Sequence, residues 1–155
     1  MKDGTGKLSS DEQALIEAAR RAIDHAHAPY SRFAVGAALR LSDGAIVTGS
    51  NFENASYGLS LCAETVAIAA ANAQGRLRDI TMLAVAGRAV ESAAQEDAPL
   101  TPCGRCRQII KEVQDMAGRP LRILCAAPAG DAHARFQLDD LLPFAFGPAN
   151  LGIGG

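Results

Sequence analysis

The chain has 155 residues, of which 48% are hydrophobic, enough for one domain with a substantial core. Its formal net charge of -2, without any run of Lys or Arg, argues against a surface for nucleic acids or anionic membranes. Aromatic residues make up only 5% of the chain and Trp is absent, which disfavours a stacking platform for single strands, so a small molecule is the expected partner.

The sequence also carries indications of its location. No basic-then-apolar signal segment opens it, and no apolar run approaches the roughly 20 residues that a membrane span needs. We therefore expect a cytoplasmic protein, in which the four cysteines serve metal binding or catalysis rather than disulfides. We expect residues 1–8 to form a flexible tail and residues 9–155 a single domain, because no linker or internal repeat divides them.

Hydrophobic periodicity and turn residues predict helices interleaved with short strands. Ser9 and Glu12 have the pattern of a capping box and begin a helix that we expect to run to about His27. Asp-Gly at 43–44 predicts a hairpin between strands 34–41 and 45–50. The elements expected after it are a polar loop 51–60, a helix from 62 to about 75, a strand 80–86, a solvated loop 90–100, a helix from 103 to about 118, a strand 121–126, a further strand within 131–138 and a small helix at 139–142. This order indicates an α/β fold, which we predict to be a three-layer α/β/α sandwich with a mixed sheet of about five strands.

Two short windows carry three thiols and a carboxylate, Cys62-Ala63-Glu64 and Cys103-Gly104-Arg105-Cys106. Cys103 and Cys106 share one helix face at a spacing of three, and both windows fall at predicted helix N-termini, where the dipole favours thiolates. Three thiolates leave a fourth tetrahedral position for water, which is typical of a catalytic zinc site. The Cys-x-x-Cys pair alone is also compatible with a redox pair or half of a structural zinc site. A four-cysteine site would need Cys125, which falls within a predicted strand and is expected to pack in the core.

Glu64 is the candidate proton carrier beside this site. Zinc with nitrogen ligands lowers the pKa of bound water to about 7. Three thiolates donate more negative charge and leave the water less acidic, so a neighbouring carboxylate is needed to take its proton. Such proton transfer contributes typically about 10²–10⁴-fold to the rate. The alternative role for Glu64 is that of an ordinary first-turn glutamate interacting with the helix dipole.

Several segments carry the motifs of a known family in the same order: YSRFAVGAA at 30–38, TGSNFENASYG at 48–58, CAE at 62–64, PCGRCRQ at 102–108 and LLPFAFGP at 141–148. They resemble the zinc-dependent cytidine deaminases of the small homotetrameric type. The resemblance implies hydrolytic deamination of cytidine and 2′-deoxycytidine to uridine and 2′-deoxyuridine with release of ammonia, in pyrimidine salvage. It also implies one Zn²⁺ per subunit, held by Cys62, Cys103 and Cys106, with Glu64 moving protons to ring N3 and to the leaving amino group.

The resemblance further implies two groups of substrate contacts. Asn51 and Glu53 would hold the ribose 3′-hydroxyl, Phe33 would pack against the pyrimidine ring, and Ala63 would contact the substrate. Residues contributed by neighbouring subunits of the tetramer would be Ala55, Tyr57 and Phe146.

One position departs from the family pattern. Many members with three cysteine ligands have arginine directly after Cys-Ala-Glu, whereas this chain has Thr65. Zinc with three thiolates and a hydroxide is negatively charged overall, so we expect Arg105 or Arg107 to take part of the missing role, with Gln108 as a hydrogen-bond donor to a thiolate. The alternatives left open are a deaminase of a modified cytosine nucleoside, such as blasticidin S or an N4-substituted cytidine, and a non-enzymatic structural zinc or redox domain.

Overall fold

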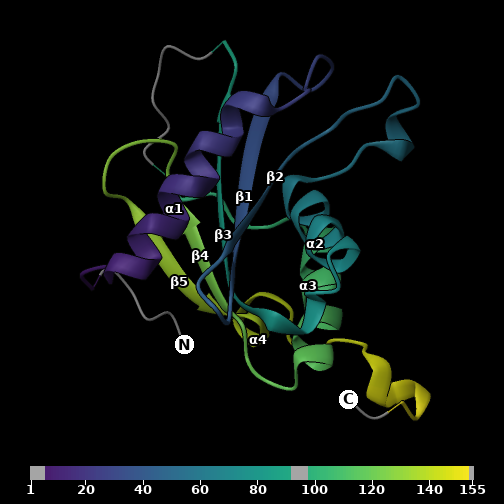
Figure 1. Cartoon of the computed structure of the whole chain (residues 1–155). Coiled ribbons are helices and arrows are strands. Elements are labelled where there is room, and N and C mark those ends of the chain that lie inside the picture. Colours follow the sequence, from purple (N-terminus) through teal and green to yellow (C-terminus); the bar gives the residue numbers. More distant parts are fainter. Residues whose placement is uncertain (1–5, 92–97, 154–155) are drawn as a thin grey trace.

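A mixed five-stranded sheet lies between helices in the computed structural model, which describes residues 6–91 and 98–153 (Figure 1). The strands are β1 (Phe33–Leu41), β2 (Ile46–Ser50), β3 (Ile80–Ala89), β4 (Arg122–Ala126) and β5 (His133–Gln137). They lie in the order β2-β1-β3-β4-β5, with β3 and β4 parallel and the other neighbours antiparallel.

Helices cover both faces of this sheet. Figure 1 shows α1 (Ser10–Ala22) on one side and α2 (Ala63–Ala73) and α3 (Gly104–Ala117) on the other. The short α4 (Leu138–Leu141) packs against α3 and β5. Single 3₁₀ turns span Ile23–His25 (η1), Tyr57–Leu59 (η2), Leu77–Asp79 (η3) and Pro148–Leu151 (η4). The prediction of a three-layer α/β/α sandwich is confirmed. The described residues include no helix that is long and apolar enough to cross a membrane.

The sheet separates two hydrophobic cores because successive strand residues point to opposite faces. Leu39 of β1 and Cys125 of β4 belong to the core shared with α2 and α3. Ala38 and Leu124, their neighbours in sequence, belong to the core beneath α1. Cys125 is fully buried, so the expectation that it packs in the core is confirmed.

Two glycines set how closely the helices approach the strands. A Cβ atom at Gly36 of β1 would lie 2.0 Å from the carbonyl oxygen of Ala19, and one at Gly49 of β2 would lie 2.4 Å from the amide nitrogen of Ala67. Any side chain at these positions would push α1 or α2 off the sheet. Gly49 therefore fixes how closely α2, the helix capped by Cys62, approaches the sheet.

The first helix ends earlier than the sequence predicts. The α-helix stops at Ala22 and continues as η1, instead of running to His27. The reason is non-local: Ser50 Oγ donates to the carbonyl oxygen of Ala22 at 2.5 Å, and the His27 amide donates to the carbonyl oxygen of Asn51 at 3.0 Å. These bonds to the β2 end draw the backbone out of the helix.

The remaining boundaries differ from the predictions by a few residues. β3 extends to Ala89 because it pairs with β1 as far as Phe33. The helix after Cys103 ends as expected at Gly118, which is left-handed with φ of 66°. Residues 1–5 of the predicted tail and 92–97 of the predicted loop lie outside the described residues. The carbonyl oxygens of Gly6 and Lys7 accept hydrogen bonds from Arg135, at 2.9 and 3.0 Å.

Candidate active site

The N-termini of α2 and α3 bring three cysteine side chains together. Cys62 is the N-cap of α2, Cys103 is the N-cap of α3, and Cys106 lies in the first turn of α3. Their Sγ atoms all lie within 4.8 Å of one another, and those of Cys62 and Cys103 are 3.7 Å apart. A tetrahedral zinc ion with Zn–S bonds of about 2.3 Å places its sulfurs about 3.8 Å apart. The donor set therefore fits zinc in both chemistry and spacing.

The environment of the cluster favours ionisation of Cys62. Hydrogen bonding with Cys106 lowers the pKa of the Cys62 thiol to about 6 in spite of its partial burial, and Cys103 and the positive charge of Arg105 add to this effect. Cys103 Sγ accepts a hydrogen bond from the Cys106 amide at 3.5 Å. A thiol that ionises near neutral pH is available as a metal ligand.

A cavity of about 390 Å³ opens beside the sulfurs, within the size range of small-molecule sites. Cys62 and Cys103 belong to its lining. The residues predicted from the sequence to contact substrate or carry protons also line it, namely Phe33, Asn51, Glu53, Ala63 and Glu64. The described lining residues include these two carboxylates and no Lys or Arg.

Asn51 and Glu53 are held by backbone groups near the start of β1. Asn51 Oδ1 accepts from the Val35 amide and its Nδ2 donates to the Phe33 carbonyl oxygen, both at 2.9 Å. Glu53 Oε2 accepts from the amides of Tyr30 and Ser31, at 2.9 and 3.2 Å. These bonds pin the segment that carries Phe33, and the carboxylate that accepts them also lines the cavity.

Glu53 is set up to be ionised. Burial opposes its ionisation, but hydrogen bonds from Ser31 and from the Tyr30 amide outweigh burial and lower the pKa of this carboxyl below its usual value. An ionised carboxylate that is only 5% exposed is a strong acceptor for a substrate hydroxyl.

Glu64 has the opposite electrostatic environment. It lies in the first turn of α2, is 4% exposed and lines the cavity. Burial raises the pKa of its carboxyl, and the negative charge of Cys62 contributes in the same direction. A carboxyl with a raised pKa can both accept and return a proton, which is what a proton carrier must do.

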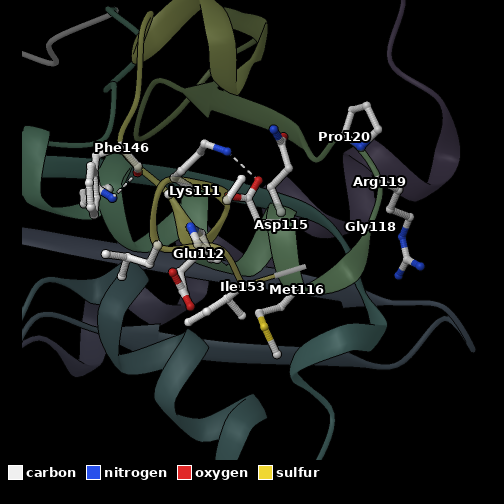
Figure 2. Close-up of a pocket in the computed structure, with 15 residues that line it drawn as sticks. Lys111, Glu112, Asp115, Met116, Gly118, Arg119, Pro120, Phe146 and Ile153 are labelled. Carbon is white, nitrogen blue, oxygen red and sulfur yellow. Dashed lines mark hydrogen bonds and ion pairs between the residues drawn. The ribbon is translucent and has the colours of Figure 1, made fainter. Parts of the chain in front are cut away.

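The residues predicted to act between subunits lie in different places. Tyr57 lines the cavity of its own chain, and Ala55 is exposed in the same loop. Phe146 lies elsewhere, at a second cavity of about 730 Å³ between α3 and the C-terminal segment. Figure 2 shows Phe146 at the edge of this cavity, with Lys111 and Glu112 of α3 beside it.

The residues expected to compensate charge mostly bind backbone carbonyls. Arg105 Nη1 donates to Ser60 at 3.2 Å, ahead of Cys62, and Arg107 Nε donates to Pro102 at 2.7 Å, ahead of Cys103. Both guanidinium groups thus tie down the chain next to a ligand cysteine. Gln108 Nε2 donates to the Phe146 carbonyl oxygen at 2.8 Å, and not to a thiol.

One polar neighbour of the sulfurs was not predicted. Thr65 Oγ1 lies 3.6 Å from Cys106 Sγ. A signal for it existed, because Thr65 follows Cys62 by three positions and therefore projects from the same side of α2.

Three clustered thiols, a buried carboxylate and an adjoining cavity on an α/β/α scaffold define a zinc-dependent hydrolytic enzyme. Residues 9–117 match the family described as "Cytidine and deoxycytidylate deaminase zinc-binding region". The chain is 40% identical over 136 residues to the cytidine deaminase of Halalkalibacterium halodurans, covering 88% of this chain and 94% of that one. It is 43% identical over 130 residues to the cytidine deaminase of Mycobacterium tuberculosis, covering 83% of this chain and 84% of that one.

Solved structures agree with the sequence comparison. The crystal structure of cytidine deaminase from Burkholderia pseudomallei superposes with a TM-score of 0.74 at 41% identity, covering 90% of this chain and 100% of that one. The crystal structure of cytidine deaminase from Mycobacterium tuberculosis gives a TM-score of 0.67 at 39% identity, covering 90% of this chain and 99% of that one. The chain belongs to the zinc-dependent cytidine deaminase family. Cys62, Cys103 and Cys106 are placed to hold one zinc ion per subunit.

Proposed function

We propose that this protein catalyses the hydrolytic deamination of cytidine and 2′-deoxycytidine to uridine and 2′-deoxyuridine, with release of ammonia, in pyrimidine salvage. The observation that carries the proposal is the buried Glu64 carboxyl, which lines the same cavity as the ligand cysteines Cys62 and Cys103. When bound, zinc supplies a Lewis acid that makes water nucleophilic at neutral pH.

Glu64 is the residue that moves protons in this proposal. It accepts one proton from the attacking water and delivers it to ring N3 of the cytosine. It then carries the second proton of that water to the exocyclic amino nitrogen, which leaves C4 as ammonia and leaves a carbonyl oxygen behind. The raised pKa of Glu64 supports this two-way role, because the carboxyl must be ionised before the first transfer and protonated after it.

The other cavity residues position the nucleoside. Oε1 of Glu53, which does not bind the Tyr30 and Ser31 amides, accepts a hydrogen bond from the ribose 3′-hydroxyl, and Asn51 offers its remaining amide hydrogen to the same group. Phe33 packs against the pyrimidine ring and Ala63 lies against the base.

The charge of the cavity favours a nucleoside over a nucleotide. Among its described lining residues, Glu53 and Glu64 are acidic and none is basic. A 5′-phosphate in this cavity would be repelled by both carboxylates and would meet no guanidinium or ammonium group among the described lining residues. We infer that uncharged nucleosides are the substrate class.

We further propose that the enzyme is a homotetramer. Large apolar side chains are exposed at several places on the described surface: Tyr30, Phe52, Tyr57, Leu59, Phe144, Phe146, Leu151 and Ile153. A surface this apolar is typical of a protein that associates. Burial between subunits also explains how Ala55, Tyr57 and Phe146 could serve a neighbour's cavity. The free ligand thiols support a reducing, cytoplasmic location.

Glu64→Gln tests the proposal directly. The amide keeps the size of the side chain but cannot carry a proton, so we expect turnover of cytidine to fall at least about 10²–10⁴-fold while bound zinc stays near one per chain. Ammonia release and zinc content are the two measurements, with the exposed Glu17→Gln as the matched control. Normal ammonia release by Glu64→Gln would contradict the assignment. A second experiment on the unaltered protein decides among the substrates. It compares the rates of deamination of cytidine, 2′-deoxycytidine and an N4-substituted cytidine.

A further inference from the structure

We propose that the Thr65 hydroxyl donates a hydrogen bond to the Cys106 thiolate, and that this neutral contact stabilises the zinc site. Thr65 is thus a positioning residue that acts through Cys106. The inference rests on the zinc site of the proposed function, but it concerns metal binding and can be tested without turnover.

The contact joins the first turns of the two site helices. Thr65 is the third residue of α2, Cys106 is the third residue of α3, and the two side chains meet with Oγ1 and Sγ 3.6 Å apart. This distance is ordinary for a hydrogen bond to the large sulfur atom. A thiolate has no proton to donate, so the hydroxyl is the donor whenever Cys106 is a ligand.

Burial explains why Cys106 in particular needs a donor. Cys103 is exposed and Cys62 is partly exposed, so water can solvate these two sulfurs. Cys106 is 0% exposed and depends on the protein for hydrogen bonds. An anionic group without solvent or a donor is strongly disfavoured in such a position.

The other two sulfurs also have their own partners. Cys103 Sγ accepts from the Cys106 amide at 3.5 Å. Cys62 lies within the field of Arg105, whose guanidinium is anchored on the carbonyl oxygen of Ser60 at 3.2 Å. Thr65 completes the set, so that each thiolate has one compensating group in the described part of the chain.

An ordinary helical role for the Thr65 hydroxyl does not account for its position. Threonine in a helix commonly bonds back to the carbonyl four residues earlier. Here that residue is Leu61, whose carbonyl oxygen accepts the amide of Phe52 at 2.9 Å. The polar contact that the structure gives the Thr65 hydroxyl is instead Cys106 Sγ.

The test compares Thr65→Val, which keeps the shape of the side chain and removes the hydroxyl, with Thr65→Ser, which keeps the hydroxyl. Groups that support a metal ligand typically contribute about 10–100-fold to metal affinity. We expect Thr65→Val to bind zinc about 10–100-fold more weakly, and Thr65→Ser to bind it within a few-fold of the unaltered protein. Zinc affinity is measured by competition with a chromophoric chelator. Thr48→Val, at an exposed position of β2, is the matched control.

A second readout separates the hydrogen bond from a general loss of structure. Cobalt(II) replaces zinc in each protein, and the sulfur-to-cobalt charge-transfer absorption is recorded. Loss of the donor raises the energy of the sulfur lone pairs, so we expect the band of Thr65→Val to move to longer wavelength and that of Thr65→Ser to stay in place. Circular dichroism of the zinc-free variants reports whether they fold alike.

The outcomes distinguish this inference from the proposed function. Unchanged zinc affinity and an unchanged cobalt spectrum in Thr65→Val would overturn the inference, whatever its turnover of cytidine. A shifted band and weaker zinc binding in Thr65→Val, rescued in Thr65→Ser, support it even if the unaltered protein releases no ammonia from cytidine. That last result would overturn the proposed function alone.

Discussion

At the scale of single residues, Glu53 combines structural and binding roles in one carboxylate. One oxygen accepts from the amides of Tyr30 and Ser31 and so holds the segment leading to Phe33. The other oxygen, Oε1, takes no part in these two bonds, and we propose that it accepts from a ribose hydroxyl. Neutral glutamine has only one oxygen, so it cannot serve both purposes.

Glu53→Gln should therefore weaken binding of the nucleoside more than it slows the chemical step. A hydrogen bond to a charged group is worth about 1.5–3 kcal/mol, which predicts a fall in kcat/KM of about 10–100-fold, mainly through KM. Steady-state kinetics with cytidine and 3′-deoxycytidine measure it. The unaltered enzyme should prefer cytidine, and Glu53→Gln should lose that preference. A preference that persists in the variant would show that Glu53 does not bind the 3′-hydroxyl.

How far the site could be predicted depended on how local its contacts are. Cys62, Glu64, Cys103 and Cys106 were identifiable because spacing and helix starts reveal them within a few residues. The contact between Thr65 and Cys106 joins two helices 41 positions apart. Gln108 was expected at a thiolate and instead binds Phe146, 38 positions away. Such pairings are set by the tertiary packing of α3, which the local sequence does not reveal.

At the scale of elements, Glu12 links α1 to two strands of the sheet. It was predicted as a capping residue, and it does bind the Ser9 amide at 2.9 Å. It also receives Arg135 Nε at 2.9 Å and Arg122 Nη1 at 3.2 Å, from β5 and β4. The local pattern revealed the cap, whereas the link to strands more than a hundred residues later required the fold.

This cluster makes stability depend on pH. Hydrogen bonding from Arg135 lowers the pKa of Glu12 from 4.5 to about 2. Because the folded-state pKa is depressed, the unfolded chain takes up the proton first as pH falls. The contribution of Glu12 is therefore fully present above about pH 4.5 and is lost as pH falls from about 4.5 to about 2.

Glu12→Gln should destabilise the protein by about 2–3 kcal/mol at pH 7, because it removes the charge that Arg135 and Arg122 face. Urea unfolding between pH 7 and pH 3 measures the difference from the unaltered protein. We expect that difference to stay constant down to about pH 5 and to shrink below it. The exposed Glu17→Gln on the same helix should cost less than about 0.5 kcal/mol. A difference that does not change with pH would show that the ionised carboxylate is not what stabilises the cluster.

At the scale of the whole molecule, the C-terminal segment exposes four large apolar side chains among the described residues, Phe144, Phe146, Leu151 and Ile153. It follows α4 and lies beyond α3, at the edge of the sandwich (Figure 1). Phe146 in this segment is 57% exposed, and its own backbone is tied to α3 through Gln108. Phe146 does not line the cavity beside the cysteines of its own chain. An exposed aromatic ring on an anchored backbone is suited to reach a neighbouring subunit.

Mixing two variants tests whether Phe146 acts between subunits. Phe146→Ala should lower kcat/KM about 5–30-fold, as expected for losing about 1–2 kcal/mol of aromatic contact with the substrate. Glu64→Gln keeps Phe146 but lacks the proton carrier. If Phe146 serves a neighbour, a co-expressed mixture forms some sites with Glu64 from one chain and Phe146 from the other. These hybrid sites should turn over cytidine with the KM of the unaltered enzyme, a combination that neither variant shows alone.

The mass in solution should be about four times the 16.1 kDa of one chain. A mixture that only reproduces a raised KM of Phe146→Ala would place Phe146 in its own chain's site, because the subunit with an intact Glu64 would then still lack its aromatic partner. An unaltered KM in Phe146→Ala alone would place Phe146 outside the active site.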